Sequence, residues 1–597
     1  MIFILVAVVS FGAWYYINSP RFLPMDFPVG KIAALESAQE FLVSRGVDPK
    51  DYRQVIVFGE DEWADRYLQK TLGIRNQERF LRQHGYELFF WRVRFFKERK
   101  KEEFSVRVSP KTGKVFEFTH LIDDVEPRND PGKDAARALG ENYLKNTQGF
   151  IPDNFDFHKE ESKRYDKRVD YTFSWEKKGV YIPWDKDKGG AKLLVGVTVS
   201  GNEVRDFYLN YLDIPENFER YINNQLVWGE QLFSFYFISF SVLVFLAVVF
   251  VIGRRQTLSL RYSKKFFIYL ASFLVVANIL SVVNNLQSLI INYPTATSLV
   301  SYIWICVMKA AINALLLSVA FIFPALAGET LTSEQFPGIR PGSLTHYLRS
   351  TFWCRSFTKL VLFGYILFSI LLGFQAIIFY FGRTYLGVWD EWTKFTQYSS
   401  SYIPFFGAFV IAVTASLNEE IMFRLFGISW SKRYFNNIVI AIILSAVIWG
   451  FGHCEYAIFP VWFRGIEVSL MGIFYGLIFV RYGIIPLIVA HYLFDAFWCA
   501  SPYIIGKGPV YLFLGALGIL FIPLGFALIA FLLNRPEAER EMVSLLDPVQ
   551  KYNLGVLRVF IAEKRCQGVS PEVVRSELVN HNWDGDLVDL ALKEIWI

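Results

Sequence analysis

Hydrophobic and polar positions divide this chain into four regions. Residues 2–17 are almost continuously apolar and end in the aromatic run 14–16, which is typical of a membrane–water interface. A long polar stretch follows, then a region dominated by apolar runs, and finally a short polar tail. We therefore expect an uncleaved N-terminal membrane anchor, an aqueous domain, a membrane domain and a soluble tail. The predicted boundaries are 1–18, 19–228, 229–533 and 534–597.

The apolar region contains nine stretches of about the length that a membrane-spanning helix needs, roughly 20 residues. Together with the anchor they predict ten spans. The fold class that we expect is therefore a multi-pass all-α membrane bundle preceded by an α+β domain. The nine stretches are 232–253, 266–289, 299–326, 357–382, 402–428, 437–453, 464–481, 484–500 and 509–533.

Positive charges gather in alternate loops between these spans. Arg254, Arg340 and Lys432 mark three basic loops that are two spans apart from one another, whereas the loops between them carry few cations. Because basic loops stay on the cytoplasmic side of a membrane, we expect these loops and the C-terminal tail to be cytoplasmic. The aqueous domain is then predicted to be extracytoplasmic, in a multi-pass protein of the cell membrane.

The aqueous domain shows the same order of elements twice. Each half starts with a helix and continues with strands in which apolar and polar residues alternate. We therefore predict two α-β-β-β repeats. The first has a helix at 31–51 and strands at 86–97, 103–110 and 114–122, and the second has a helix at 133–156 and strands at 169–178, 192–200 and 204–212.

These repeats resemble the PepSY-like repeats of secreted and membrane-anchored bacterial proteins, through their topology and through the turn Lys-Thr-Gly-Lys-Val at 111–115. The histidines His84, His120 and His158 stand singly, so no catalytic set is assembled here. We expect this domain to bind, sense or shield, and its candidate ligand is an extracytoplasmic partner.

Composition restricts the remaining choices. A net charge of +5 over 597 residues is too small to indicate a nucleic-acid partner. The five cysteines are scattered, and they form neither a disulfide framework nor a paired zinc motif. The tail contains two short amphipathic helices on either side of Asp584-Gly585-Asp586, so we predict a small cytoplasmic helical tail.

Two adjacent carboxylates stand out in the membrane region. Glu419 and Glu420 follow the apolar run 402–417, where each charge costs roughly 2.5–3.5 kcal/mol on insertion scales. On a helix Arg424 is the i,i+4 neighbour of Glu420 and neutralises it. Glu419 is left as the unpaired acid, which is suited to act as a general base. The alternative is a Glu-Arg pair that only locks two helices together.

Two histidines occupy further apolar stretches. His453 ends one span after Trp449, and His491 lies one helical turn before Asp495 in another. The depth of each group in the membrane can be counted from the cytoplasmic end of its helix, at 1.5 Å per residue. By this count His453 lies roughly 8 Å deeper than the carboxylates Glu420 and Asp495, and helix tilt can close this offset. Between them, the small-xxx-small spacing of Gly472 and Gly476 allows close helix approach.

The order Glu-Glu-x-x-x-Arg, then aromatic-x-x-x-His, then Gly-x-x-x-Gly and His-x-x-x-Asp resembles the CPBP family over about residues 400–500. This family contains the CAAX-protease and bacteriocin-processing intramembrane proteins, including the type II prenyl-protein endopeptidases. The resemblance implies an all-helical bundle that hydrolyses a peptide bond of a membrane-associated substrate without a covalent intermediate. The resemblance also implies a role for each site residue. Glu419 activates a water molecule, and His453 shares that water. His491 holds the oxyanion with Asp495 as its partner, and Glu420 and Arg424 organise the site.

This chain departs from the family pattern at two positions. Trp449 stands where Phe is common, and Asp495 stands where Asn is common. An Asn side chain can donate a hydrogen bond to an oxyanion, whereas an ionised Asp cannot. Asp495 is therefore expected either to be protonated or to accept a hydrogen bond from His491 and fix its tautomer.

Three other interpretations remain open at this stage. Two histidines with a glutamate and an aspartate also resemble a zinc or iron site, so we expect no cofactor but leave a divalent metal and a metalloendopeptidase reaction open. A non-catalytic binding or immunity scaffold, or a transporter, would use the same spans without hydrolysis. Lys309, in the middle of an apolar stretch, is predicted to pair with a buried acid such as Glu467.

Overall fold

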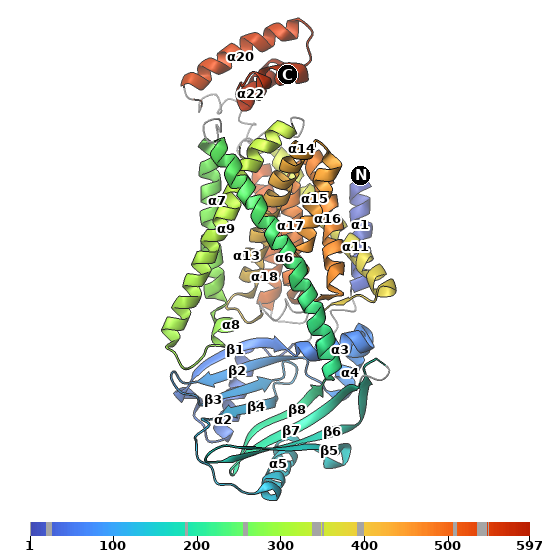
Figure 1. Cartoon of the computed structure of the whole chain (residues 1–597), viewed down its shortest axis with the longest axis vertical. Helices are drawn as coiled ribbons and strands as arrows, with labels where there is room; N and C mark the ends of the chain where they lie inside the picture. The colour runs from blue at the N-terminus through green and yellow to red at the C-terminus, as the bar shows by residue number, and fades with distance from the viewer. Residues whose placement is uncertain are drawn as a thin grey trace.

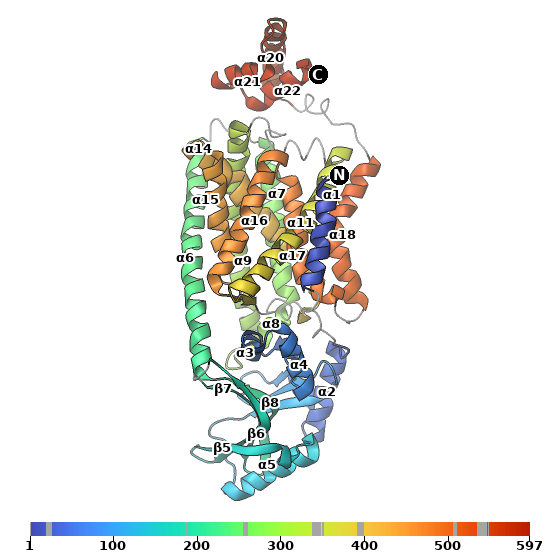
Figure 2. The same cartoon turned by 90° about the vertical axis from the view of Figure 1, so that its right-hand side faces the viewer.

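The structure is a computed structural model, in which the helical bundle lies between a sheet domain at one end and three short helices at the other (Figure 1). A long helix, α6 (Glu216–Gly253), runs along the side of the bundle and reaches the sheet domain (Figure 2). The predicted boundary after residue 228 thus falls inside a helix. The structure describes residues 2–18, 27–185, 189–254, 261–336, 345, 348, 352–390, 399–505, 510–533, 546 and 548–596.

The described residues include eight helices that are long and apolar enough to cross a membrane, together with two shorter apolar helices. Each of the ten predicted spans overlaps one of these helices, so the multi-pass helical fold is confirmed. Besides α6, the long helices are α7 (Arg261–Asn284), α9 (Leu299–Gln335), α11 (Arg355–Tyr385), the continuous segment 404–435, α16 (Val461–Tyr482), α17 (Ile485–Ile505) and α18 (Val510–Leu533); the shorter ones are α1 (Ile2–Asn18) and α15 (Ile438–Phe451).

The sheet domain contains one antiparallel sheet of eight strands in the order β1-β2-β3-β4-β8-β7-β6-β5. Two sets of four strands meet where β4 pairs with β8, and each set follows a helix, α2 (Lys31–Ser44) or α5 (Lys133–Gln148). The strands are β1 (Arg53–Glu60), β2 (Phe89–Phe96), β3 (Glu103–Val108), β4 (Val115–Leu121), β5 (Phe155–Arg164), β6 (Val169–Pro183), β7 (Gly190–Ser200) and β8 (Glu203–Asp213).

Each predicted unit of three strands therefore lacked one strand. In β1 the run Val55–Phe58 is buried on both faces, because Val55 and Val57 pack against Ile291 and Tyr293 of the bundle. In β5 nearly every side chain is exposed, as suits an edge strand protected by charge. Neither strand shows the alternation of a half-buried strand. The interpretation of the two halves as repeats stays a prediction.

The sheet domain is fixed to the bundle by buried polar contacts. The Arg94 guanidinium donates hydrogen bonds to the carbonyl oxygens of Ile291 (2.9 Å) and Tyr293 (2.8 Å), close to the end of the short helix α8 (Leu286–Ile290). The hydroxyl oxygen of Ser400 accepts a hydrogen bond from the backbone N–H of Phe58 (2.9 Å). Ser400 lies four residues before the helix that carries Glu419, so the sheet domain holds the start of that helix.

The stability of the sheet domain is expected to decrease between about pH 4.5 and pH 2. Burial raises the pKa of Glu203, but the hydrogen bond from His120 and the charges of His120, Arg128 and Arg45 outweigh burial and lower it from 4.5 to about 2. A lowered folded-state pKa stabilises the fold above the unfolded value, and this stabilisation is lost as the pH falls through the folded value. We expect the thermal unfolding midpoint of Glu203→Gln to fall less steeply with pH over this window than that of the wild type. Glu161→Gln, which changes an exposed carboxylate of β5, should show the same pH dependence as the wild type. An unchanged pH profile for Glu203→Gln would contradict the role assigned to Glu203.

The C-terminal helices form a small unit with its own hydrophobic core. They are α20 (Pro548–Cys566), α21 (Pro571–Asn580) and α22 (Gly585–Trp596), and the core includes Leu557, Val574 and Val588. The two helices predicted around Asp584–Asp586 correspond to α21 and α22, and α20 precedes them. Most of the connection from 534 to 547 lies outside the described residues.

Candidate active site

The two adjacent glutamates lie where one helix changes its winding. Helix α13 (Pro404–Glu419) continues into the π-helical segment η4 (Glu420–Ile428) and then into α14 (Ser429–Phe435). Every residue of η4 is buried. Glu419 lines a cavity, whereas the adjacent Glu420 is fully buried in the packed interior. Short π-helical segments inside α-helices are frequent at functional sites.

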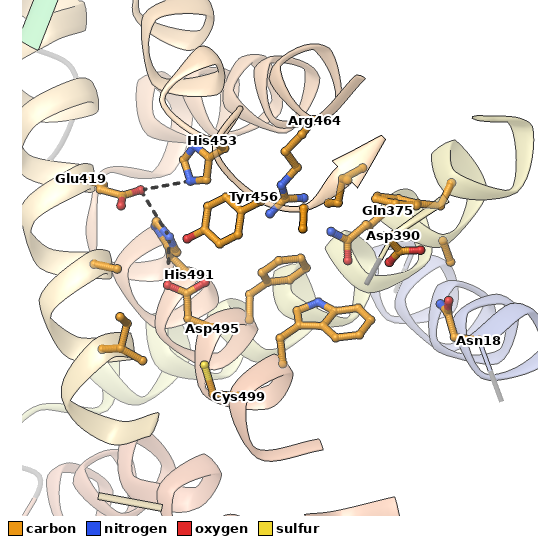
Figure 3. Close-up of a pocket in the computed structure, with 18 of the residues that line it drawn as sticks. Asn18, Gln375, Asp390, Glu419, His453, Tyr456, Arg464, His491, Asp495 and Cys499 are labelled. Carbon is orange, nitrogen blue, oxygen red and sulfur yellow. Dashed lines mark ion pairs between the residues drawn. The ribbon is translucent and has the colours of Figure 1, made fainter. Parts of the chain in front are cut away.

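The structure brings four of the predicted side chains to one cavity, shown in Figure 3. The Oε2 atom of Glu419 lies 4.0 Å from Nε2 of His453 and 3.8 Å from Nε2 of His491. The Oδ2 atom of Asp495 lies 3.5 Å from Nε2 of His491. Glu419 also accepts a hydrogen bond from the indole N–H of Trp449, so it is not the unpaired acid that the sequence indicates.

The predicted depth offset of His453 is closed by the local backbone. Helix α15 ends at Phe451, and the chain turns at residues 452–455. The Nδ1 atom of His453 lies 3.0 Å from the carbonyl oxygen of Trp449, one turn earlier, so the imidazole points back along the helix towards Glu419. A count along a straight helix overestimates the depth because it ignores this reversal.

Glu420 and Arg424 form the predicted pair in the packed interior. Their side chains are buried, with Nη1 of Arg424 3.2 Å from Oε1 of Glu420. The guanidinium lies 3.9 Å from the ring centroid of Trp449 and 4.9 Å from that of Tyr475, at distances typical of cation–π contacts. Arg424 therefore links η4 to α15 and α16 as well as neutralising Glu420.

The partner that orients His491 differs from the one considered in the sequence. Nδ1 of His491 lies 2.8 Å from Oε1 of Glu420, which is shorter than the 3.5 Å from its Nε2 to Asp495. Glu420 accepts a hydrogen bond from the Nδ1–H group of His491, and this leaves Nε2 facing the cavity. The carboxylate that fixes the ring is therefore Glu420, from a different helix, rather than Asp495 on the same one.

The cavity continues away from these four residues and has a volume of about 270 Å³. Its far end is lined by Tyr456, Arg464, Gln375, Asp390 and Asn18 (Figure 3). The ring of Tyr456 stacks on that of His453, with centroids 5.6 Å apart and planes at 14°. Sequence reasoning missed these residues because Tyr456 and Asp390 lie outside the helices, Arg464 and Asn18 lie near helix ends, and Gln375 is an isolated polar residue inside α11, although the Tyr456 position, three residues after His453, was a usable signal.

Two short strands close this end of the cavity. Strand β9 (Trp389–Asp390) pairs with β10 (Ile458–Phe459), and helix α3 (Glu62–Leu72) of the sheet domain contacts β9. Helices α1, α11 and α17 end towards the sheet domain (Figure 1). Asn18 is the last residue of α1, Asp390 lies in β9 after α11, and Cys499 lies in the last two turns of α17. The cavity therefore extends from the middle of the bundle towards the sheet domain.

Lys309 does not reach this region, which corrects the prediction. It is exposed on α9, and no ion pair joins it to a carboxylate among the described residues. Glu467 is buried and instead binds Arg464 and Gln375, the latter at 3.1 Å. A single cation at the outer surface of a span can extend its long side chain towards the membrane surface rather than pair inside the bundle.

The donor atoms do not fit a metal site. Among the residues that the structure describes, no three His, Cys, Asp or Glu side chains converge as metal ligands would. Metal-bound nitrogen and oxygen atoms lie about 2.0–2.2 Å from zinc and converge on one point. The Nε2 atoms of His491 and His453 lie 3.8 and 4.0 Å from the same Glu419 oxygen, and their Nδ1 atoms face Glu420 and a backbone carbonyl oxygen. No step of the chemistry below is assigned to a metal.

Comparison with known proteins finds related sequences for this part of the chain. Residues 401–497 match the family model for Rce1-like proteins, described as "Type II CAAX prenyl endopeptidase Rce1-like". Over 120 residues the chain is 28% identical to the sporulation-killing factor biosynthesis protein SkfC of Bacillus subtilis (strain 168), which covers 20% of this chain and 24% of that protein. The aligned part thus spans about a quarter of the relative's length. No solved structure gives a significant match.

The matched segment contains all six residues predicted for the site, from Glu419 to Asp495. The resemblance to the family of CAAX proteases and bacteriocin-processing proteins, first recognised from three short motifs, is confirmed for this segment.

Proposed function

We propose that this chain is an intramembrane endopeptidase that hydrolyses a peptide bond of a membrane-associated protein or peptide. The observation that carries the proposal is the shared cavity, in which Glu419 lies within 4.0 Å of ring nitrogens of both His453 and His491. The family description of residues 401–497 supports the same class of reaction. No observation favours a non-catalytic scaffold, which stays the alternative outcome of the tests.

Glu419 acts as the general base in this proposal. A water molecule between Glu419 and His453 gives one proton to the Glu419 carboxylate, and its oxygen forms a bond to the carbonyl carbon of the substrate. The protonated Glu419 then passes that proton to the leaving amine when the carbon–nitrogen bond breaks. The immediate products are a carboxylic acid and an amine, the acid then gives its proton to the amine or to solvent, and Glu419 returns to its starting state without a covalent intermediate.

His491 stabilises the oxyanion of the tetrahedral intermediate. With both ring nitrogens protonated, Nδ1–H donates to Glu420 and Nε2–H is available to the oxyanion in the cavity. Asp495, 3.5 Å from the same Nε2, is the partner that the oxyanion replaces when substrate binds. Glu420 and Arg424 serve as positioning residues, because their contacts fix His491 and Trp449 rather than the substrate.

The substrate enters from the sheet-domain side in this proposal, because the cavity extends in that direction. If the basic loops are cytoplasmic, the sheet domain and the cavity mouth face outside the cell. The sheet domain is then placed to bind an extracytoplasmic partner or to select the substrate. A membrane peptide or precursor suits this placement, and the tests below include prenylated and unprenylated peptides.

The proposal is tested by trapping the substrate. The Glu419→Gln protein, purified from its native membrane, should retain a peptide that mass spectrometry identifies and that the wild-type protein cuts. A prenylated peptide and its unprenylated counterpart, offered to the wild-type protein in parallel, show whether the lipid is required. If the wild-type protein cuts no peptide that the variant retains, the chain binds without hydrolysis and the endopeptidase proposal is wrong.

Removal of divalent metal ions is expected to leave activity nearly unchanged. Incubation with EDTA and 1,10-phenanthroline should reduce peptide hydrolysis by less than about twofold, since no three metal-ligating side chains converge among the residues that the structure describes. Elemental analysis of the same preparation supplies the control. Loss of activity that added zinc restores, together with one bound zinc per chain, would establish the metal-dependent alternative.

A further inference from the structure

A second cavity reaches Glu419 from the other side of α13. It has a volume of about 410 Å³ and lies between helices α6, α7, α9 and α13. Ile411, Ala415 and Glu419 line both this cavity and the one that contains the histidines. Glu419 therefore stands in the wall between two cavities, and a group that enters through the second one can reach its carboxylate without crossing the first.

Polar side chains follow the second cavity along two facing helices. Asn278, Ser281 and Asn285 are spaced i, i+3 and i+7, so they lie on one face at the end of α7. Thr414 and Asn418 are spaced i, i+4 on α13 and line the same cavity. We call these five residues the polar seam. Polar residues in apolar spans are costly unless they find hydrogen-bond partners, so a polar seam on two facing helices requires an explanation.

Two oxygen atoms on this seam have no hydrogen-bond partner among the residues that the structure describes. Oδ1 of Asn285 and Oγ1 of Thr414 are buried and unpaired, although the Asn285 amide donates its N–H to the carbonyl oxygen of Ser281 (3.0 Å). Buried polar atoms of native proteins are almost always satisfied by the protein or by ordered water. A polar cavity of this size is large enough for several water molecules, each of which needs two to four polar partners.

The seam runs from the sheet-domain end of the bundle to Glu419. Asn284 joins α7 to the start of α13 by two hydrogen bonds with the backbone of Ile403, at 2.9 and 2.8 Å, beside α8 and the sheet domain (Figure 1). Thr414 lies about one and a half turns before Glu419, or roughly 7.5 Å along the helix axis. The polar atoms thus span the distance between an aqueous end of the bundle and the carboxylate.

We propose that the second cavity is a water channel that supplies the hydrolytic water to Glu419 while the peptide fills the first cavity. This inference rests on the proposed hydrolase function only for the use of the water. A bound peptide covers the cavity that holds His453 and His491, whereas the path along Asn285, Ser281 and Thr414 stays open. Each catalytic cycle consumes one water molecule, so an intramembrane site that substrate closes on one side needs a second entrance.

The channel is tested by thiol labelling, which needs no activity. In a chain whose five native cysteines are replaced by alanine, Ser281→Cys should react with a small charged methanethiosulfonate at least about tenfold faster than Val283→Cys, because the reaction requires a hydrated thiolate. Val283 is a matched control two residues away on the exposed, apolar face of α7. Thr414→Cys tests the α13 side and provides a second variant if one fails to fold.

Labelling of Ser281→Cys should persist when the Glu419→Gln background holds a trapped peptide in the first cavity. The channel proposal would be overturned if Ser281→Cys and Thr414→Cys were both labelled no faster than Val283→Cys. Complete protection by the bound peptide would show one continuous cavity and would overturn it as well. Neither result depends on hydrolysis, so failure of the channel is distinguishable from failure of the endopeptidase proposal.

A kinetic measurement tests the use of the channel. The double variant Asn285→Leu with Thr414→Val should lower kcat several-fold and leave KM unchanged, because it removes partners of the water and no contact of the peptide. Ser318→Ala is the control, since Ser318 donates to the backbone of its own helix and does not line the cavity. An unchanged kcat in the double variant would overturn the assignment of this water as the reactant.

Discussion

Replacing Glu419 by glutamine is expected to lower the rate of peptide hydrolysis by at least about 100-fold, the lower range for a general base. The amide cannot accept the proton of the attacking water, so the first step of the proposed reaction is lost. The fold should survive, because the amide oxygen still accepts the hydrogen bond from Trp449 and the side chain is 26% exposed towards the cavities. The measurement is a single-turnover cleavage assay of the reconstituted protein together with its thermal unfolding midpoint.

Two further variants show whether the loss is specific. Glu455→Gln removes an exposed carboxylate two residues after His453 and should leave the rate unchanged. His453→Ala removes the second group near the proposed water and should lower the rate in the same direction as Glu419→Gln. Retention of biological activity by both Glu419→Gln and His453→Ala would show that the site does not hydrolyse and that the chain acts as a binding scaffold.

The sequence predicted those features that depend on neighbours along the chain. Runs of apolar residues located the eight helices that are long and apolar enough to cross a membrane and the two shorter apolar helices, and i,i+4 spacing paired Glu420 with Arg424. Hydropathy locates membrane-spanning segments because lipid offers no hydrogen-bond partners. An apolar segment in lipid must therefore form a helix that pairs its own backbone N–H and C=O groups. Where a strand is buried on both faces or exposed on both faces, as in β1 and β5, the alternating pattern disappears and the strand was missed.

Features that depend on contacts between distant segments were not predictable in the same way. The hydrogen bond between His491 and Glu420 joins two helices 71 residues apart, so spacing along α17 suggested Asp495 instead. Arg464, Asp390 and Tyr456 reach the cavity from helix ends and turns whose placement follows from packing. The convergence of Glu419 with two histidines was expected from the family resemblance, but its geometry depends on the turn after α15.

Replacing Arg424 by leucine is expected to destabilise the folded bundle by about 3–5 kcal/mol, because it leaves the buried Glu420 without its cation. Arg424 is one of the largest fully buried side chains among the described residues, and it also contacts the rings of Trp449 and Tyr475. The free energy of unfolding can be measured in detergent micelles by denaturant titration. The matched control is Arg433→Leu, which removes a cation from the same helical segment where it is 40% exposed and pairs with Glu334.

A second substitution separates the charge of Arg424 from its packing. In the double variant Glu420→Gln with Arg424→Leu, the uncompensated carboxylate is gone, so part of the lost stability should return. Together with the single variant Glu420→Gln it completes a double-mutant cycle that measures the coupling of the pair. Arg424→Lys keeps a cation but loses the flat guanidinium that lies against the two rings, so its stability should fall between those of Arg424→Leu and the wild type. If Arg424→Leu and the double variant are equally stable, the pair contributes through ring contacts and not through its charge.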